Sequence, residues 1–435
     1  MIRRPIAALA ACWLAWTTLT LAPARGADWP PRGGLRVVFL GDSITQAGTY
    51  VRYIDGYLAT RFPDRPVEII GLGLSSETAA GTSEPGHPYP RPDIHARLAR
   101  ALELARPDLV FVCYGMNDGI YAPPDPDRID RYRRGIADVV AAARQVGASV
   151  IVGTPPPFDA RPIRERTAPL SATEFTYKNP YLDYDGVLGL YAGLLLDRRA
   201  EGWAVADVHG ASRDALDALR TADPNFTLAT DGVHPGGDGH WLIARAYLEA
   251  WGASSTPEVD SAVVDAKDRA VVRGQVGLVD SGPDDDSLRL TWTTRIPLPR
   301  DPAWDARLVR FERLDDRFNR HRLAVVGLSA PRYAIYEDAR PVGEASRAEL
   351  AAGLDLLRFP QLSSNRRAAE VFALIERKHA ALRPAWLEEV GHGPPNFARA
   401  PTVAEATAAT APVVAEIRRL ATPAPINLRL VPIGG

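Results

Sequence analysis

The chain has 435 residues, 46% of them hydrophobic, which is enough for a sizeable core and for more than one domain. Its formal net charge of −2 at pH 7 excludes the strongly basic composition of a nucleic-acid-binding protein. With only Cys12 and Cys113 and scattered histidines, the sequence has neither a disulfide framework nor a metal-ligand cluster, and we expect no cofactor.

The first 26 residues have the pattern of a secretory signal peptide. Arg3 and Arg4 precede an apolar segment over 6–21, and small residues follow at 22, 24, 26 and 27. Because threonines interrupt this short segment, an uncleaved membrane anchor is only the second interpretation. We therefore expect an exported protein, periplasmic or secreted, whose mature form has no membrane span.

A serine follows the first predicted strand. Residues 35–40 form a short apolar run that is typical of a buried parallel strand, and Gly41 and Asp42 end it. Apolar residues at helical spacing follow over 51–62. Ser43 is thus expected at the carboxyl end of the strand, the edge at which open α/β sheets bind ligands.

Strand and helix patterns then alternate up to about residue 253, which indicates a parallel sheet covered by helices on both faces. Further strands are predicted at 67–70, 109–114, 149–153 and 203–206, with helices over 94–102, 129–140, 187–200, 212–220 and 239–251. Residues 155–185 are a long polar and proline-rich insertion. Its aromatic residues favour a packed active-site wall over disorder.

The pattern changes after about residue 254. Residues 257–300 and 321–337 have the pattern of short strands with turns, helical patterns cover 345–357, 365–383 and 403–421, and a last strand is predicted at 426–432. We therefore divide the chain into a signal peptide (1–26), an α/β domain (35–253) and a mixed α+β C-terminal extension (255–435). The helical patterns argue against a plain β-sandwich carbohydrate-binding module. Whether the extension is independent or wraps back over the first domain stays open.

Four short blocks follow successive elements of the α/β domain: 41–43, 71–78, 115–118 and 231–235. Acyl transfer needs a nucleophile, a base, a group that orients the base and donors for the oxyanion. Ser43 offers the hydroxyl, and His234 an imidazole that titrates near neutral pH. Asp231, three residues earlier, can reach its other ring nitrogen. Asn117 offers an uncharged amide donor.

The four blocks in this order closely resemble the SGNH (GDSL-type) hydrolase family, over residues 35 to 253. The resemblance implies a flavodoxin-like, three-layer α/β fold and hydrolysis of small acyl esters. It also implies that the backbone N–H groups of Ser43 and of a glycine in the second block join Asn117 in the oxyanion hole. Many relatives with secretion signals deacetylate sugars, so an acylated small molecule or glycan is the expected substrate.

The second block departs from the family pattern. When it is aligned on Glu77 and Thr78, Ser76 occupies the usual glycine position, and Gly73 lies three residues earlier. Serine also has a backbone N–H, but a turn that requires positive φ would strain it. The second backbone donor is therefore expected at either Ser76 or Gly73.

Alternatives remain for the site and for the function. Asp207 and His209 form a second acid–histidine pair, which we interpret as core or rim. Within the same class, the protein could be a lipase or thioesterase-type acylhydrolase, although the arginines of the insertion argue against the apolar rim of a lipase. From another class, it could be a non-catalytic glycan-binding protein on a hydrolase scaffold. The oligomeric state is not predicted.

Overall fold

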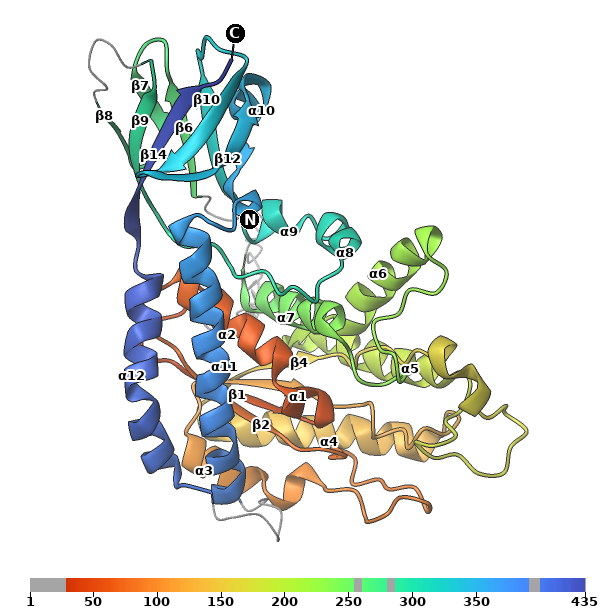
Figure 1. Cartoon of the computed structure of the whole chain (residues 1–435). Helices are drawn as coiled ribbons and strands as arrows, with labels where there is room; N and C mark the ends of the chain where they lie inside the picture. The colour runs from red at the N-terminus through yellow and green to blue at the C-terminus, as the bar shows by residue number, and fades with distance from the viewer. Residues whose placement is uncertain (1–28, 254–259, 280–285, 391–399, 435) are drawn as a thin grey trace, which may run out of the picture.

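The computed structural model describes residues 29–253, 260–279, 286–390 and 400–434 (Figure 1). The predicted signal peptide and residues 254–259, at the start of the predicted C-terminal extension, lie outside these ranges. Within them, the structure contains no helix that is both long enough and apolar enough to cross a membrane.

A parallel sheet forms the centre of the first domain. Its strands are β1 (Arg36–Gly41), β2 (Glu68–Gly73), β3 (Leu109–Cys113), β4 (Ser149–Gly153) and β5 (Ala204–Ala206). They lie in the order β2-β1-β3-β4-β5, which is the flavodoxin-like order. Every residue of the central β3 is buried, so both faces of the sheet need a covering layer. The predicted fold class is confirmed.

Helices supply these layers (Figure 1). They are α1 (Ser43–Ala47), α2 (Thr49–Arg61), α3 (Leu98–Ala105), α4 (Pro126–Gln145), α5 (Tyr184–Asp197), α6 (Val208–Ala222) and α7 (Gly237–Trp251). Helices α2 and α7 cover one face of the sheet, and α3 and α4 cover the other. Short 3₁₀ turns occur at Ile94–Ala96, Arg161–Arg166 and Arg198–Glu201. The predicted helices overlap these elements, and their ends differ by a few residues.

The C-terminal extension contains two further sheets with a core of their own. One has the order β13-β10-β6-β7 and the other the order β12-β11-β14-β9-β8. Their bounds are β6 (Asp260–Asp265), β7 (Ala270–Arg273), β8 (Val276–Val279), β9 (Leu288–Thr294), β10 (His321–Val326), β11 (Arg332–Glu337), β12 (Arg340–Ser346), β13 (Leu354–Asp355) and β14 (Ala424–Pro432). Alternating burial along β9 shows one face packed inward.

One helix prediction in the extension is only partly right. Within 345–357 the helix α10 covers only Arg347–Ala352, because β12 pairs with β11 up to Ser346 and β13 begins at Leu354. Ser346 and Glu349 form a capping box, which sets the start of the short helix.

The extension also wraps back over the α/β domain. The segment with α8 (Ala306–Phe311) and α9 (Leu314–Arg317) adds Trp304 and Phe318 to the core of the first domain. Helix α11 (Ser363–Glu389) lies against α2 and β2, with α12 (Val403–Ala421) packed against α11 (Figure 1). Lys378 on α11 forms a buried ion pair with Asp55 on α2, at 2.5 Å. The extension therefore forms a β module of its own and also covers part of the α/β domain.

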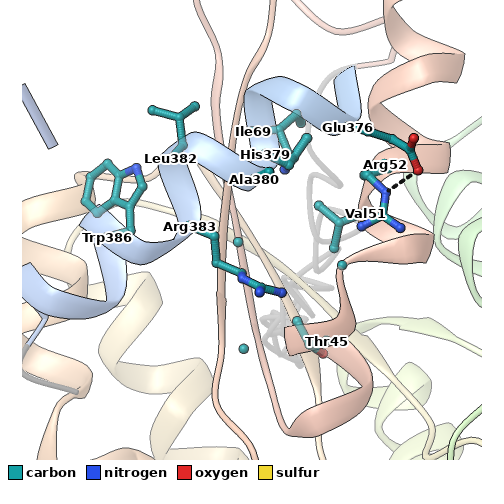
Figure 2. A pocket seen from close by; sticks show the side chains of 13 residues that line it. Thr45, Val51, Arg52, Ile69, Glu376, His379, Ala380, Leu382, Arg383 and Trp386 are labelled. Atoms are coloured by element: carbon teal, nitrogen blue, oxygen red, sulfur yellow. Dashed lines mark ion pairs between the residues drawn. The ribbon is translucent and has the colours of Figure 1, made fainter. Parts of the chain in front are cut away.

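Helix α11 covers the outer edge of the sheet, where β2 has no neighbouring strand. A cavity of about 150 Å³ remains between α11 and this edge (Figure 2). Arg383 from α11 lines it, and its guanidinium donates to the carbonyl of Gln46 at 2.5 Å.

Candidate active site

Ser43 is the first residue of α1, directly after β1. Asp42 caps this helix, because its carboxylate accepts the N–H of Ile44 at 2.9 Å. His234 lies in the loop before α7, and its Nε2 is 2.9 Å from the Ser43 hydroxyl oxygen. The structure thus brings together two predicted site residues that are 191 positions apart in the chain.

Asp231 holds the other side of the imidazole. Its Oδ2 is 2.7 Å from Nδ1 of His234, and its Oδ1 accepts the backbone N–H groups of Val233 and His234 at 2.9 and 2.8 Å. A carboxylate at Nδ1 favours the tautomer with the proton on that nitrogen. Nε2 is then free to accept the proton of the Ser43 hydroxyl.

The pKa shifts of Asp231 and His234 agree with the hydrogen bonds between them. The hydrogen bond that the imidazole donates to Asp231 raises the pKa of His234 above its ordinary value of 6.5, against the opposing effect of burial. Burial would raise the pKa of Asp231, but the side chain and the backbone N–H of His234 hold it well below its usual value. Asp231 is therefore ionised at neutral pH, and its carboxylate makes the imidazole of His234 a stronger base.

Asn117 follows β3 at the same edge of the sheet and is buried, with 3% of its surface exposed. Its Nδ2 donates to the carbonyl of Glu77 at 3.2 Å. Its Oδ1 accepts from Arg91 at 2.9 Å and from the hydroxyl of Tyr121 at 3.2 Å. Since an amide nitrogen has two hydrogens, one N–H of Asn117 remains for an oxyanion.

Arg91 and Glu84 lie in the loop between β2 and α3 and were not among the site residues predicted from the sequence. Their side chains form a buried pair in which two guanidinium nitrogens donate to the two carboxylate oxygens, each at 2.6 Å. Buried charges normally need such a partner. An arginine and a glutamate seven positions apart in an irregular loop follow no helical or strand spacing, so the sequence alone carries little signal for the pair.

Gly73 packs α1 against β2 and does not face the site. The N–H groups of Glu68 and Leu74 both donate to carbonyls of the β1 side. Because successive N–H groups of a strand point to opposite sides, that of Gly73 points to the outer edge. A Cβ at Gly73 would lie 2.2 Å from the backbone nitrogen of Gln46, so the close approach of α1 requires glycine.

Ser76 has a φ of +65°, in the left-handed region that favours glycine. This conformation is the one expected of the glycine with which Ser76 aligns. With the N–H of Gly73 turned away, Ser76 is the better candidate for the second backbone donor.

Substitutions at Ser76 test this assignment. We expect Ser76→Gly and Ser76→Ala to keep turnover within about threefold, since both retain the backbone N–H. Ser76→Pro should lower kcat by about 10²-fold, because proline has no N–H and cannot adopt positive φ. Steady-state kinetics of the three variants provide the measurement. Equal loss in Ser76→Ala and Ser76→Pro would instead assign the effect to the side chain.

The other candidates have structural contacts. Asp207 caps α6 by accepting the N–H of Gly210, and His209 Nδ1 lies 3.3 Å from the carbonyl of Pro155. Asp118 is buried and accepts the N–H groups of Ala79 and Ala80. None of these contacts reaches the Ser43 hydroxyl. Among the described residues, no group of three or more His, Cys, Asp or Glu side chains is arranged to hold a metal ion.

The fold and the arrangement of these side chains define a class of α/β hydrolytic domains with a serine at the first strand end. Residues 39–242 match the model of the GDSL-like Lipase/Acylhydrolase family. This part of the chain is therefore a GDSL-like lipase/acylhydrolase domain, a family of hydrolases that act on ester bonds.

Individual proteins resemble the chain over different lengths. An acetylxylan esterase from Geobacillus stearothermophilus is 24% identical over 242 residues, which cover 50% of this chain and 94% of that protein. The structure of a gut microbial diltiazem-metabolizing enzyme has a TM-score of 0.72 at 18% identity and covers 93% of this chain and 99% of its own. An acetyl-xylooligosaccharide esterase from the same Geobacillus species has a TM-score of 0.38 at 22% identity and covers 51% of this chain and 95% of its own. The similarity to the diltiazem-metabolizing enzyme shows a shared fold that includes most of the C-terminal extension.

Proposed function

We propose that the protein is an exported serine ester hydrolase that removes acetyl or other short acyl groups from a carbohydrate. The observation that carries the proposal is the hydrogen-bonded series Ser43–His234–Asp231, at the same edge of the sheet as the Asn117 amide, which follows β3. The family of residues 39–242 supports ester hydrolysis. The similarity to an acetylxylan esterase supports an acetylated sugar as the substrate class.

In the first half of the proposed reaction, the Ser43 hydroxyl oxygen attacks the acyl carbon while its proton passes to Nε2 of His234. The carbonyl oxygen becomes an oxyanion, which accepts hydrogen bonds from Asn117 and from the backbone donors. When the tetrahedral intermediate collapses, the bond to the sugar oxygen breaks. The imidazolium returns the proton to that oxygen, which leaves the acyl group on Ser43.

Water completes the cycle by the same route. His234 removes a proton from a water molecule, whose oxygen attacks the acyl carbon of the acyl-enzyme. Collapse of the second tetrahedral intermediate breaks the bond to Ser43, and the serine oxygen regains its proton from the imidazolium. Asp231 remains ionised throughout and stabilises the imidazolium of each half-reaction.

The surroundings of the site support a polar substrate. The side chains of Asp231 and His234 are 49% and 51% exposed, so a bulky alcohol group has access to them. In the described loops beside the site, the large hydrophobic side chains with high exposure are Tyr89 and Leu170, and Arg161 and Arg166 are also exposed. A lipase would need a broader apolar rim.

A substrate panel tests the proposal. We expect acetylated xylo-oligosaccharides and short-chain nitrophenyl esters to be hydrolysed with far higher kcat/KM than nitrophenyl esters of long acyl chains. A fluorophosphonate probe should label Ser43, which would not happen in a non-catalytic glycan-binding protein. A preference for long acyl chains would favour the lipase or thioesterase alternative, and absence of both labelling and hydrolysis would reject the enzyme.

The pH dependence gives a separate prediction. Because Asp231 raises the pKa of His234, kcat/KM should rise with pH through a midpoint above 6.5, as the imidazole loses its proton. In Asp231→Asn the negative charge is gone, so this midpoint should move to lower pH while the maximal rate falls. Rates between about pH 5 and pH 9 provide the measurement. An unchanged midpoint would mean that another group limits the rate.

A further inference from the structure

We propose that Arg91 is a positioning residue of the oxyanion hole, which fixes the orientation of the Asn117 amide and strengthens it as a donor. This inference rests on the proposed function, because it assumes that Asn117 donates to the oxyanion. It gives a role to a buried ion pair, Arg91 with Glu84, that the reaction itself does not use.

The contacts of the guanidinium are specific. Nη1 of Arg91 donates to Oδ1 of Asn117 at 2.9 Å and lies 3.5 Å from the carbonyl oxygen of Ser76. The side chain is 2% exposed and also lies over the ring of Tyr121, at 5.5 Å from its centroid. One nitrogen of Arg91 therefore contacts both Asn117 and the turn that contains Ser76.

Arg91 determines which end of the amide faces the site. A guanidinium has donors only, and the Tyr121 hydroxyl also donates to the same oxygen. A flipped amide would place its own NH₂ group against Arg91, with donor facing donor. Oδ1 must therefore face Arg91, which leaves Nδ2 to donate to Glu77 and to the oxyanion.

The positive charge also affects donor strength. A cation at Oδ1 draws electron density from the amide nitrogen, and this effect is large in a buried site with few competing waters. Burial alone would lower the pKa of Arg91, but its hydrogen bonds with Glu84 raise the pKa above its usual value, so the guanidinium stays charged. Glu84 thus keeps the cation in place beside Asn117.

A second buried ion pair, between the side chains of Arg97 and Glu77, stabilises the turn, and its own hydrogen bonds do not include the Asn117 side chain. Arg97 donates to the Glu77 carboxylate at 2.6 Å and to the carbonyl of Leu72 at 2.7 Å. These hydrogen bonds of Arg97 lie on the turn and on β2, whereas those of Arg91 include the Asn117 side chain. Arg91 is therefore the charged group that acts on the amide itself.

A double-mutant cycle tests the proposal. The paired change Arg91→Met with Glu84→Gln removes both charges without leaving one buried alone. We expect kcat to fall about 30-fold with KM within about threefold, since the oxyanion forms only in the transition state. In an Asn117→Ala background the same paired change should cost at most about twofold, because the amide on which Arg91 acts is gone.

Three further variants keep the test decisive. Arg245→Met with Glu312→Gln removes a largely buried ion pair between α7 and the end of α8, in which nitrogen and oxygen are 2.8 Å apart. This change should lower Tm while leaving kcat within about twofold. Arg91→Lys keeps the charge and should recover most of kcat. If the Met and Gln pair does not fold, Arg91→Gln with Glu84→Gln offers a polar substitute with the same expected coupling to Asn117.

The outcomes separate the inference from the proposed function. If the paired change at Arg91 and Glu84 lowers kcat by the same factor with and without Asn117→Ala, Arg91 acts independently of the amide. That result would overturn the inference. A change in KM alone would also overturn it. If Asn117→Ala itself keeps wild-type kcat, the inference fails while the proposed hydrolysis by Ser43 stands. If Ser43→Ala is as active as the wild type, the proposed function fails.

Discussion

Ser43→Ala is expected to lower kcat for acetyl ester hydrolysis by about 10⁵-fold, which corresponds to about 7 kcal/mol of transition-state stabilisation. The alanine has no oxygen to attack the acyl carbon, and His234 then has no hydroxyl to deprotonate. A small residual rate should persist through direct attack by water, because Asn117 and the backbone donors are still present. Single-turnover assays with a chromogenic acetyl ester give the measurement.

The same variant should fold normally. Asp42, and not Ser43, caps α1, and the Ser43 side chain contacts His234 and is not part of the hydrophobic core. We expect Tm to change by less than about 2 °C. A fully folded Ser43→Ala protein with activity within tenfold of the wild type would contradict a serine mechanism.

The elements that carry the site could be predicted because local pattern determines them. An apolar run that ends at Gly41, and another that ends before Gly115, mark strand ends without knowledge of the rest of the chain. Parallel strands then bring these ends to one edge of the sheet. That is why Ser43 and Asn117, which follow β1 and β3, could be placed together from the sequence. His234 lies in the loop before α7, and its pairing with Ser43 was predicted from the chemistry of the four blocks and their resemblance to the SGNH family.

The layer formed by α11 could not be placed from the sequence. The apolar stripe of an amphipathic helix shows that one face is buried, but not which surface covers it. In the structure this surface is the edge strand β2 together with α2, and the Lys378–Asp55 ion pair joins α11 to α2. Such a contact between distant parts of the chain has no periodic signal.

The details of the oxyanion hole were also beyond the sequence. The positive φ of Ser76 is a property of the folded turn, and a serine in the sequence does not indicate positive φ as a glycine would. The contact of Arg91 with Asn117 depends on how the loop after β2 folds over the end of β3. Residue types at strand ends therefore indicate the chemistry, whereas loop conformation determines how well the donors are oriented.

His234→Ala is expected to lower kcat nearly as much as Ser43→Ala, by about 10⁴-fold or more, because the serine loses its base and the leaving oxygen loses its proton donor. The residual rate should increase with pH, since hydroxide can replace the missing base. Labelling by a fluorophosphonate should become correspondingly slow. Kinetics over a range of pH, together with the labelling rate, test both parts.

His209→Ala is the matched control, because it removes the same side chain from the histidine of the second acid–histidine pair. The His209 ring lies against the carbonyl of Pro155, and Asp207 is occupied as the cap of α6, so neither can orient a base toward Ser43. We expect kcat within about tenfold of the wild type and a modest loss of Tm from the missing contact. If His209→Ala were the crippling change and His234→Ala mild, the 2.9 Å contact between His234 and Ser43 would not be the catalytic one, and the base would have to come from the end of β5.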